Sequence, residues 1–206
     1  ENTLRALDYA RAMQETMVSG TMAWDGASNN RAFIAGDLWL TQNGVSIYYA
    51  TKTANDARQN AIAADIQHAD MPHGVAGRAP STALTLMGMV PRYARFPNAA
   101  TDYLRFMMEA EQYDPWLTGC LGYWSQPLKA YADSAVWSSD PRIAWYRTAM
   151  DTPFYEGYRG PISAATGAVN ENWVVVDMFA RVVTGQSRPA DSMRDAARAA
   201  RRWYRS

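Results

Sequence analysis

The 206-residue sequence lacks the features that mark several classes of protein. It has a single cysteine, Cys120, so no internal disulfide can form and the redox compartment stays open. No run approaches the ~18 apolar residues that a membrane-spanning helix needs. Twenty basic residues balance twenty acidic ones, so no net charge attracts nucleic acid or an anionic membrane. These absences favour a globular protein with a buried core.

Catalytic and metal-binding patterns are also missing. The two histidines, His68 and His73, bracket Asp70, but their spacing matches no common zinc motif and Pro72 prevents helical alignment of the rings. Ser46 follows one glycine and lacks the second glycine of a nucleophile elbow. The sequence therefore predicts no catalytic residue, no metal and no cofactor. The acidic residues are scattered, and a saccharide-active enzyme with a carboxyl pair remains the alternative.

Hydrophobic periodicity predicts a helix-rich α/β chain of about eight helices and three strands. Trp39 and Trp116 are expected in the core. The strands are expected at residues 38–40, 64–69 and 82–90. The helices are expected from Asn2 to near Gly20, at 53–61, from Pro97 through Ala110, from Asp140 to about Met150, from Trp173 to Gly185, and after Pro189.

Eight tryptophans and twelve tyrosines are the unusual part of the composition. Tyr48, Tyr49, Tyr123 and Trp124 adjoin glycines and polar amides in predicted loops. Rings in such a setting can stack on the C–H face of a sugar while amides and hydroxyls bond to its hydroxyl groups. Packing in a hydrophobic core is the competing interpretation.

The last predicted helix carries a basic stripe of Arg194, Arg198, Arg201 and Arg205, spaced four, three and four residues apart. A nucleic-acid surface would require more basic patches and a basic domain. A solvated outer face is favoured, and a helical interaction module is the second alternative.

Five stretches, taken in order, resemble the extracellular solute-binding proteins of ABC importers, in the carbohydrate-binding group that includes the maltose-binding protein. In the first, Trp39 and Leu40 replace a small residue and Met; in the fourth, Trp124-Ser125-Gln126 displace the usual Pro. The stretches are NNRAFIAGDLWLTQNGVSI (29–47), MPHGVAGR (71–78), NAATDYLRFMMEAEQ (98–112), GCLGYWSQPLKAY (119–131), and DPRIA (140–144) with the helical region 174–200.

The resemblance implies two α/β lobes of the periplasmic-binding-protein-like type II fold, with this chain as the C-terminal half of the two-lobed protein. Residues 1–78 and 136–206 would belong to the C-terminal lobe and residues 79–135 would return to the N-terminal lobe. Such a protein binds a solute, here a sugar, in the periplasm or outside the cell by hinge closure. It delivers the solute to ABC permease subunits without a chemical step, and it binds no nucleic acid.

Matching positions to the family's binding loops gives the candidate ligand contacts. Two further aromatic residues, Trp24 and Tyr158, are candidates because they lie in flanking turns. The residues carried over from the family are Asn43, Gly44, Ser46, Tyr48, Tyr123, Trp124, Asn172 and Trp173.

Overall fold

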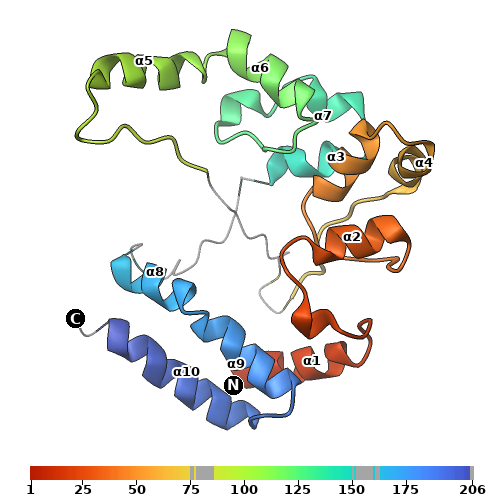
Figure 1. The fold of residues 1–206 in the computed structure, drawn as a ribbon, viewed down its shortest axis with the longest axis vertical. Coiled ribbons are helices and arrows are strands. Elements are labelled where there is room, and N and C mark those ends of the chain that lie inside the picture. Colours follow the sequence, from red (N-terminus) through yellow and green to blue (C-terminus); the bar gives the residue numbers. More distant parts are fainter. Residues whose placement is uncertain (75–76, 78–85, 150, 152–159, 161–162, 205–206) are drawn as a thin grey trace. The chain divides into compact units, whose positions relative to one another are not determined.

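The computed structural model describes residues 1–74, 77, 86–149, 151, 160 and 163–204. Every regular element in these residues is a helix (Figure 1). The chain forms two compact units. Unit 1 comprises Glu1–Ser28 with Tyr155–Ser206, and unit 2 comprises Asn29–Phe154.

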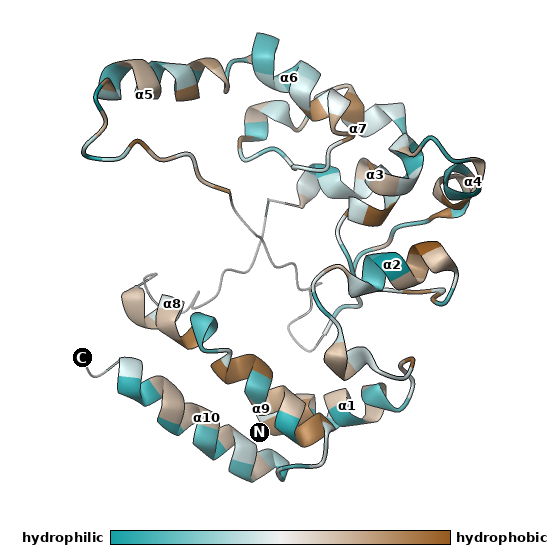
Figure 2. Cartoon of the chain, in the orientation of Figure 1, coloured by the Kyte–Doolittle hydropathy of each residue, from teal (hydrophilic) through white to brown (hydrophobic). Residues whose placement is uncertain are grey.

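Unit 1 is a small helical assembly in which α9 contacts α1, α8 and α10. Leu7, Met178 and Val182 form its buried centre, and Phe179 and Met193 pack around them. In Figure 2 much of α9 is brown, whereas α10 mixes teal with pale residues. Its helices are α1 (Asn2–Gln14), the 3₁₀ helix η1 (Thr21–Ala23), α8 (Ala164–Glu171), α9 (Val174–Val183) and α10 (Pro189–Trp203).

The junction of α9 and α10 shows why the sequence breaks there. Gly185 adopts a left-handed conformation (φ 73°), and its N–H donates to the Val182 carbonyl at 3.1 Å. Glycine is favoured at such a helix end because it has no Cβ to clash. Pro189 then occupies the first turn of α10, where its missing N–H costs nothing. The predicted end at Gly185 and the predicted start at Pro189 are confirmed.

Unit 2 packs short helices around a larger, aromatic core. The α3 and α4 helices contact each other, as do α7 and η3. The core is formed by Val45, Ile47, Tyr48, Ala63, Ile66, Tyr113, Leu117, Tyr131, Val136, Trp137 and Ile143. The helices are α2 (Ser28–Ala35), α3 (Ser46–Thr53), α4 (Ala57–Asp65), α5 (Pro97–Phe106), α6 (Ala110–Gly119), η2 (Lys129–Tyr131), α7 (Val136–Ser139) and η3 (Ala144–Thr148).

The described residues contain no strand, so they do not show the α/β class. The first predicted strand, 38–40, is irregular. In the second, residues 64–65 end α4 and residues 66–69 are irregular. In the third, residues 86–90 are irregular, and 82–85 lie outside the described residues. A strand must pair its backbone N–H and C=O groups with a neighbour, and the described part of the chain offers none. The expected burial of Trp39 and Trp116 is also wrong, since they are 97% and 42% exposed.

Several predicted helices have other bounds. Asn2 is helical while Glu1 occupies the N-cap, and α1 ends at Gln14 instead of near Gly20. The helix expected over 53–61 starts at Ala57, because the Asp56 carboxylate accepts from the Gln59 N–H at 2.8 Å and caps it. The helix expected from Pro97 through Ala110 is interrupted after Phe106.

The helix expected from Asp140 is wrong within the described residues. Asp140 has an extended backbone (φ −146°) that ends α7, and only the 3₁₀ helix η3 follows. The Asp140 carboxylate accepts hydrogen bonds from the Tyr48 hydroxyl and from the Arg142 N–H, and the chain turns at this point. We call residues 140–142 the corner. The division of the chain at residues 78 and 135 stays a prediction. None of the described helices combines the length and the apolar character needed to cross a membrane.

Candidate functional site

A cluster of amide and hydroxyl groups surrounds the first turn of α3. The Ser46 Oγ accepts hydrogen bonds from Asn30 Nδ2 and Asn43 Nδ2, each at 2.9 Å. Asn43 Nδ2 also donates to Asn30 Oδ1 at 2.8 Å. Beside them, Asn29 Nδ2 donates to Thr41 Oγ1 at 3.3 Å. Because both lone pairs of the Ser46 oxygen are occupied, its hydroxyl proton is left to donate to a third group.

Three aromatic rings form a second cluster one turn along α3. The Tyr49 and Tyr123 rings meet edge to face, with centroids 5.3 Å apart and an interplanar angle of 72°. Tyr123 in turn meets Trp124 at 5.0 Å and 63°. Tyr49 and Tyr123 are half-buried, while Trp124 is 39% exposed. These edge-to-face contacts fix the rings and leave indole surface open.

The α3 helix joins the two clusters. Ser46 and Tyr49 are three residues apart, which places them on the same side of a helix. Ile47, Tyr48 and Thr51 are buried and take the other side into the core. Polar and aromatic groups therefore share one side of α3. We call the set Asn30, Asn43, Ser46, Tyr49, Tyr123 and Trp124 the α3 face.

The loop that carries Tyr123 and Trp124 is held in an unusual backbone conformation. Leu121 (φ 51°) and Gly122 (φ 68°) are both left-handed. A Cβ at Gly122 would lie 2.5 Å from the Trp137 ring, so glycine is required for this close approach. Downstream, the buried Gln126 donates from Nε2 to the Arg147 carbonyl at 2.7 Å. The loop is thus anchored at both ends.

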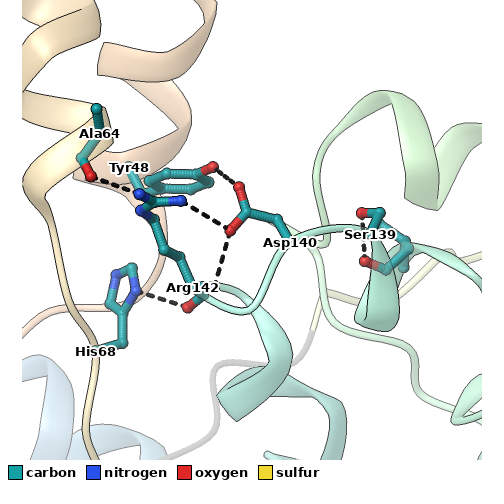
Figure 3. A network of polar contacts seen from close by, with 7 residues as sticks. Tyr48, Ala64, His68, Ser139, Asp140 and Arg142 are labelled. Carbon is teal, nitrogen blue, oxygen red and sulfur yellow. Dashed lines mark hydrogen bonds and ion pairs between the residues drawn. The ribbon is translucent and has the colours of Figure 1, made fainter.

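A polar network lies behind α3 (Figure 3). The Tyr48 hydroxyl donates to the Asp140 carboxylate. Arg142 donates to the same carboxylate from its backbone N–H at 2.9 Å and from Nη1 at 3.3 Å. Its Nη2 donates to the Ala64 carbonyl near the end of α4, and His68 Nδ1 donates to the Arg142 carbonyl at 2.8 Å. The network ties the corner at residues 140–142 to α3 and α4.

The ionisation of these groups follows from their surroundings. Burial raises the pKa of Tyr48 to about 12, and the neighbouring Asp140 carboxylate adds to the shift. Burial alone would raise the pKa of Asp140. The hydrogen bonds from Tyr48 and Arg142 outweigh it and hold that pKa below its usual value. At neutral pH, therefore, Tyr48 is a neutral phenol that donates a hydrogen bond to the ionised carboxylate of Asp140.

The ligand residues predicted in unit 2 occupy three kinds of position. Asn43, Ser46, Tyr123 and Trp124 belong to the α3 face, and Asn43 contacts Ser46 directly. Gly44 is exposed in the same loop. Tyr48 lies in the core, 1% exposed, with its hydroxyl on Asp140. The fold therefore brings four of these residues together on the α3 face, through the contact of Tyr49 with Tyr123.

The other predicted residues belong to unit 1 or are not described. Trp173 is 65% exposed and left-handed (φ 53°) at the N-cap of α9. Asn172 ends α8, donates to the Ala168 carbonyl at 2.8 Å, and lines a groove of about 240 Å³ between α9 and α10. Trp24 is half-buried after η1. Tyr158 lies outside the described residues.

Two alternative kinds of site receive no support from the described residues. They contain no group of histidine, cysteine or acidic side chains arranged to hold a metal ion. On α10, Arg194 pairs with Asp191, and Arg198 with Asp195 at 3.8 Å. Two arginines of the predicted basic stripe are thus balanced by carboxylates on the same helix, which weakens its interpretation as a nucleic-acid surface. Arg205 of that stripe lies outside the described residues.

Sequence reasoning missed the residues that hold the site together. Asn30 was not among the candidate contacts, yet it bonds to both Asn43 and Ser46. Asp140 and Arg142 were expected to start a helix. The sequence offered one signal for Asn30: it belongs to the pair Asn29-Asn30, which precedes the candidate contact Asn43. No local signal links Tyr48 to Asp140, which is 92 residues away.

Residues 1–144 match the family described as bacterial extracellular solute-binding protein. The chain belongs to this family. Searches among curated proteins and among solved structures gave no match. Members of the family bind a solute and pass it to the permease of an ABC transporter, and they are not enzymes. The expectation of a non-enzymatic, extracellular solute-binding protein is confirmed, and the matched range contains the whole α3 face.

Proposed function

We propose that this solute-binding protein carries a carbohydrate-like solute, as in the maltose-binding-protein-like group, and that the α3 face contacts it. The observation that carries the proposal is the shared side of α3, where Ser46 and Tyr49 bring an amide–hydroxyl cluster next to aromatic rings. The bound solute is then delivered to the ABC permease subunits outside the cytoplasm.

The chemistry of the α3 face suits a polyhydroxylated ligand. A sugar hydroxyl both donates and accepts hydrogen bonds. The Ser46 proton can be donated, and the Asn43 amide oxygen can accept. The exposed indole of Trp124 offers an apolar face for the C–H side of a sugar ring. Tyr48 acts in this proposal as a support, because its hydroxyl already bonds Asp140 in the core.

Trp24, Tyr158, Asn172 and Trp173 are also proposed as ligand contacts. Hinge closure around the solute is what the family resemblance implies for the complete protein. The exposed ring of Trp173 supports this role, since 65% of that residue is open to solvent.

We also propose that the complete fold is the two-lobed type II α/β fold. The support comes from an apolar surface in unit 2. None of the α5 residues is buried, and the preceding segment exposes Met87, Met89 and Tyr93. Such an extended apolar surface on a soluble protein needs a covering element. The parent gene would show whether a further α/β lobe is encoded.

Calorimetry on the complete protein with a panel of mono- and oligosaccharides tests the function. We expect Trp124→Ala to weaken binding roughly tenfold, the equivalent of ~1.4 kcal/mol from one lost stacking contact. Trp145→Ala is the matched control, because Trp145 is 51% exposed in unit 2 but does not belong to the α3 face.

The outcomes separate two parts of the proposal. If no saccharide binds the folded protein, the carbohydrate assignment fails. If a saccharide binds and Trp124→Ala leaves its affinity at the level of Trp145→Ala, the solute is bound elsewhere and the α3 face is refuted as the contact surface.

A further inference from the structure

His68 occupies a central position in the polar network behind α3. Its Nδ1 donates to the Arg142 carbonyl at 2.8 Å (Figure 3). Its ring meets Tyr48 edge to face at 6.0 Å and 86°, and Tyr146 at 5.2 Å and 74°. The half-buried imidazole is therefore enclosed by α3, by η3 and by the corner at residues 140–142.

The charges around this ring are nearly balanced. Asp140 carries a negative charge and Arg142 a positive one, and the two are bonded to each other at 3.3 Å. The rings from α3 and η3, Tyr48 and Tyr146, are neutral, because burial raises the pKa of each phenol to about 12. On the α4 side the neighbouring group is the Ala64 carbonyl, which accepts from Arg142.

A second positive charge would disturb this balance. The buried Arg142 Nε has no hydrogen-bond partner among the described residues, so part of the guanidinium is already poorly solvated. An imidazolium formed at His68 would add a charge in the same partly buried space. Its cost is repaid only in part by the single carboxylate of Asp140.

We propose that His68 is an acid-sensitive latch: protonation of its ring loosens the corner at residues 140–142 from α3 and α4. The corner is held to α3 through Tyr48 and to α4 through the Ala64 carbonyl, and His68 secures its backbone at Arg142. Loosening it frees α3, the helix that carries Ser46 and Tyr49. A consequent loss of solute at acid pH rests on the proposed function, whereas the latch itself does not.

The direction of the pH effect follows from linkage. Burial lowers the pKa of His68 below its ordinary value of 6.5, although the hydrogen bond to the Arg142 carbonyl and the Asp140 charge oppose the shift. The unfolded chain therefore takes up a proton at higher pH than the folded chain does. The contribution of neutral His68 to the free energy of unfolding is therefore fully present above pH 6.5. It is lost as the pH falls through the pKa that His68 has in the folded protein. One proton can lower the folding constant at most tenfold per pH unit.

The chain offers a matched control, because its one other histidine, His73, is exposed. Urea unfolding from pH 7.5 to pH 5 would be compared for the wild type, His73→Gln, His68→Asn and His68→Gln. Asn keeps a donor near the Nδ1 position, and neither replacement titrates. We expect the wild type and His73→Gln to lose folding constant with the same slope below pH 6.5. Both His68 variants should show a flatter profile. Equal slopes in all four proteins would overturn the latch.

A second measurement decides the question if the His68 variants do not fold. In His73→Gln, His68 gives the sole imidazole signal, so NMR can follow its titration directly. We expect a pKa below 6.5 and amide shifts of Tyr48 and Arg142 that titrate with the ring. A pKa at or above 6.5, or amide signals of these residues that do not move with it, would contradict the proposal.

Discussion

Replacing Gly122 with alanine should destabilise unit 2 by roughly 2–5 kcal/mol, the sum of two costs. Gly122 is left-handed (φ 68°), a conformation that costs a residue with a Cβ about 1–2 kcal/mol. The new Cβ would also lie 2.5 Å from Trp137 Cζ3 and 2.6 Å from Cη2. Relieving such an overlap in a packed core costs about 1–3 kcal/mol.

Trp137 has little freedom to move away. It is buried, 4% exposed, and its Nε1 donates to the Tyr131 carbonyl at 3.1 Å. Its neighbours in the core are Val136, Tyr131 and Leu117, among others. A shift of the indole would break the hydrogen bond or displace the core, and therefore the two costs should add.

Two other glycines separate the costs. Gly185 is left-handed (φ 73°) but has no atom within 4 Å of its Cβ position, so Gly185→Ala should show the backbone cost alone. Gly119, at the end of α6, has an open Cβ position and an ordinary φ, so Gly119→Ala should be neutral or stabilising by about 0.5–1 kcal/mol. Urea unfolding followed by circular dichroism measures all three. Equal losses for Gly122→Ala and Gly185→Ala would refute the close contact with Trp137.

Two further substitutions test the buried network and the left-handed backbone of Trp173. Tyr48→Phe removes the hydrogen bond to Asp140 and should cost about 1.5–3 kcal/mol at pH 7 by urea unfolding. The pKa of Asp140 is lowered in the folded protein, so the stability from its charge is present above pH 3.8 and is lost as the pH falls through the folded pKa. The Tyr48→Phe deficit should shrink over that range, and a deficit that stays constant while the folded carboxyl takes up its proton contradicts the charged bond. Trp173→Gly relieves the left-handed backbone of a residue with a Cβ and should raise the stability of unit 1 by about 1 kcal/mol in thermal unfolding. Solute binding should weaken in the same variant. A loss of stability would show that packing of the Trp173 ring outweighs the backbone strain.

Sequence patterns located helix ends where one residue determines the backbone. Gly185 and Pro189 mark the boundary of α9 and α10 because each restricts what the chain can do on its own. The helix expected after Asp140 failed for the opposite reason. Its first residue bonds to Tyr48, a distant partner that no local pattern contains. Apolar residues at 38–40 and 82–90 were predicted as strands from composition, but such runs form strands only beside a pairing partner.

The same distinction applies to the candidate site. Asn43, Ser46, Tyr123 and Trp124 were predicted because they match positions in the family's binding loops, and Tyr123 and Trp124 also adjoin a glycine and polar amides. Asn30 was missed because its role depends on the packing of α2 beside the loop before α3. Tyr48 was carried over from the same binding loops, and the sequence could not show that its side of α3 faces the core. The period of a helix places Ser46 and Tyr49 together only once the helix is known.

The α3 face therefore depends on residues that never reach the surface. Ile47, Tyr48 and Thr51 fix the orientation of α3, and Tyr48 is held by Asp140 across 92 residues of chain. Ser46 and Tyr49 can take up their positions only when the corner at residues 140–142 has docked. Since residues 1–144 match the family, the matched region contains both the surface and the carboxylate that orients it. If the α3 face binds the solute as proposed, substitutions at this corner should alter solute affinity without touching the solute, because they act on the helix that carries Ser46 and Tyr49.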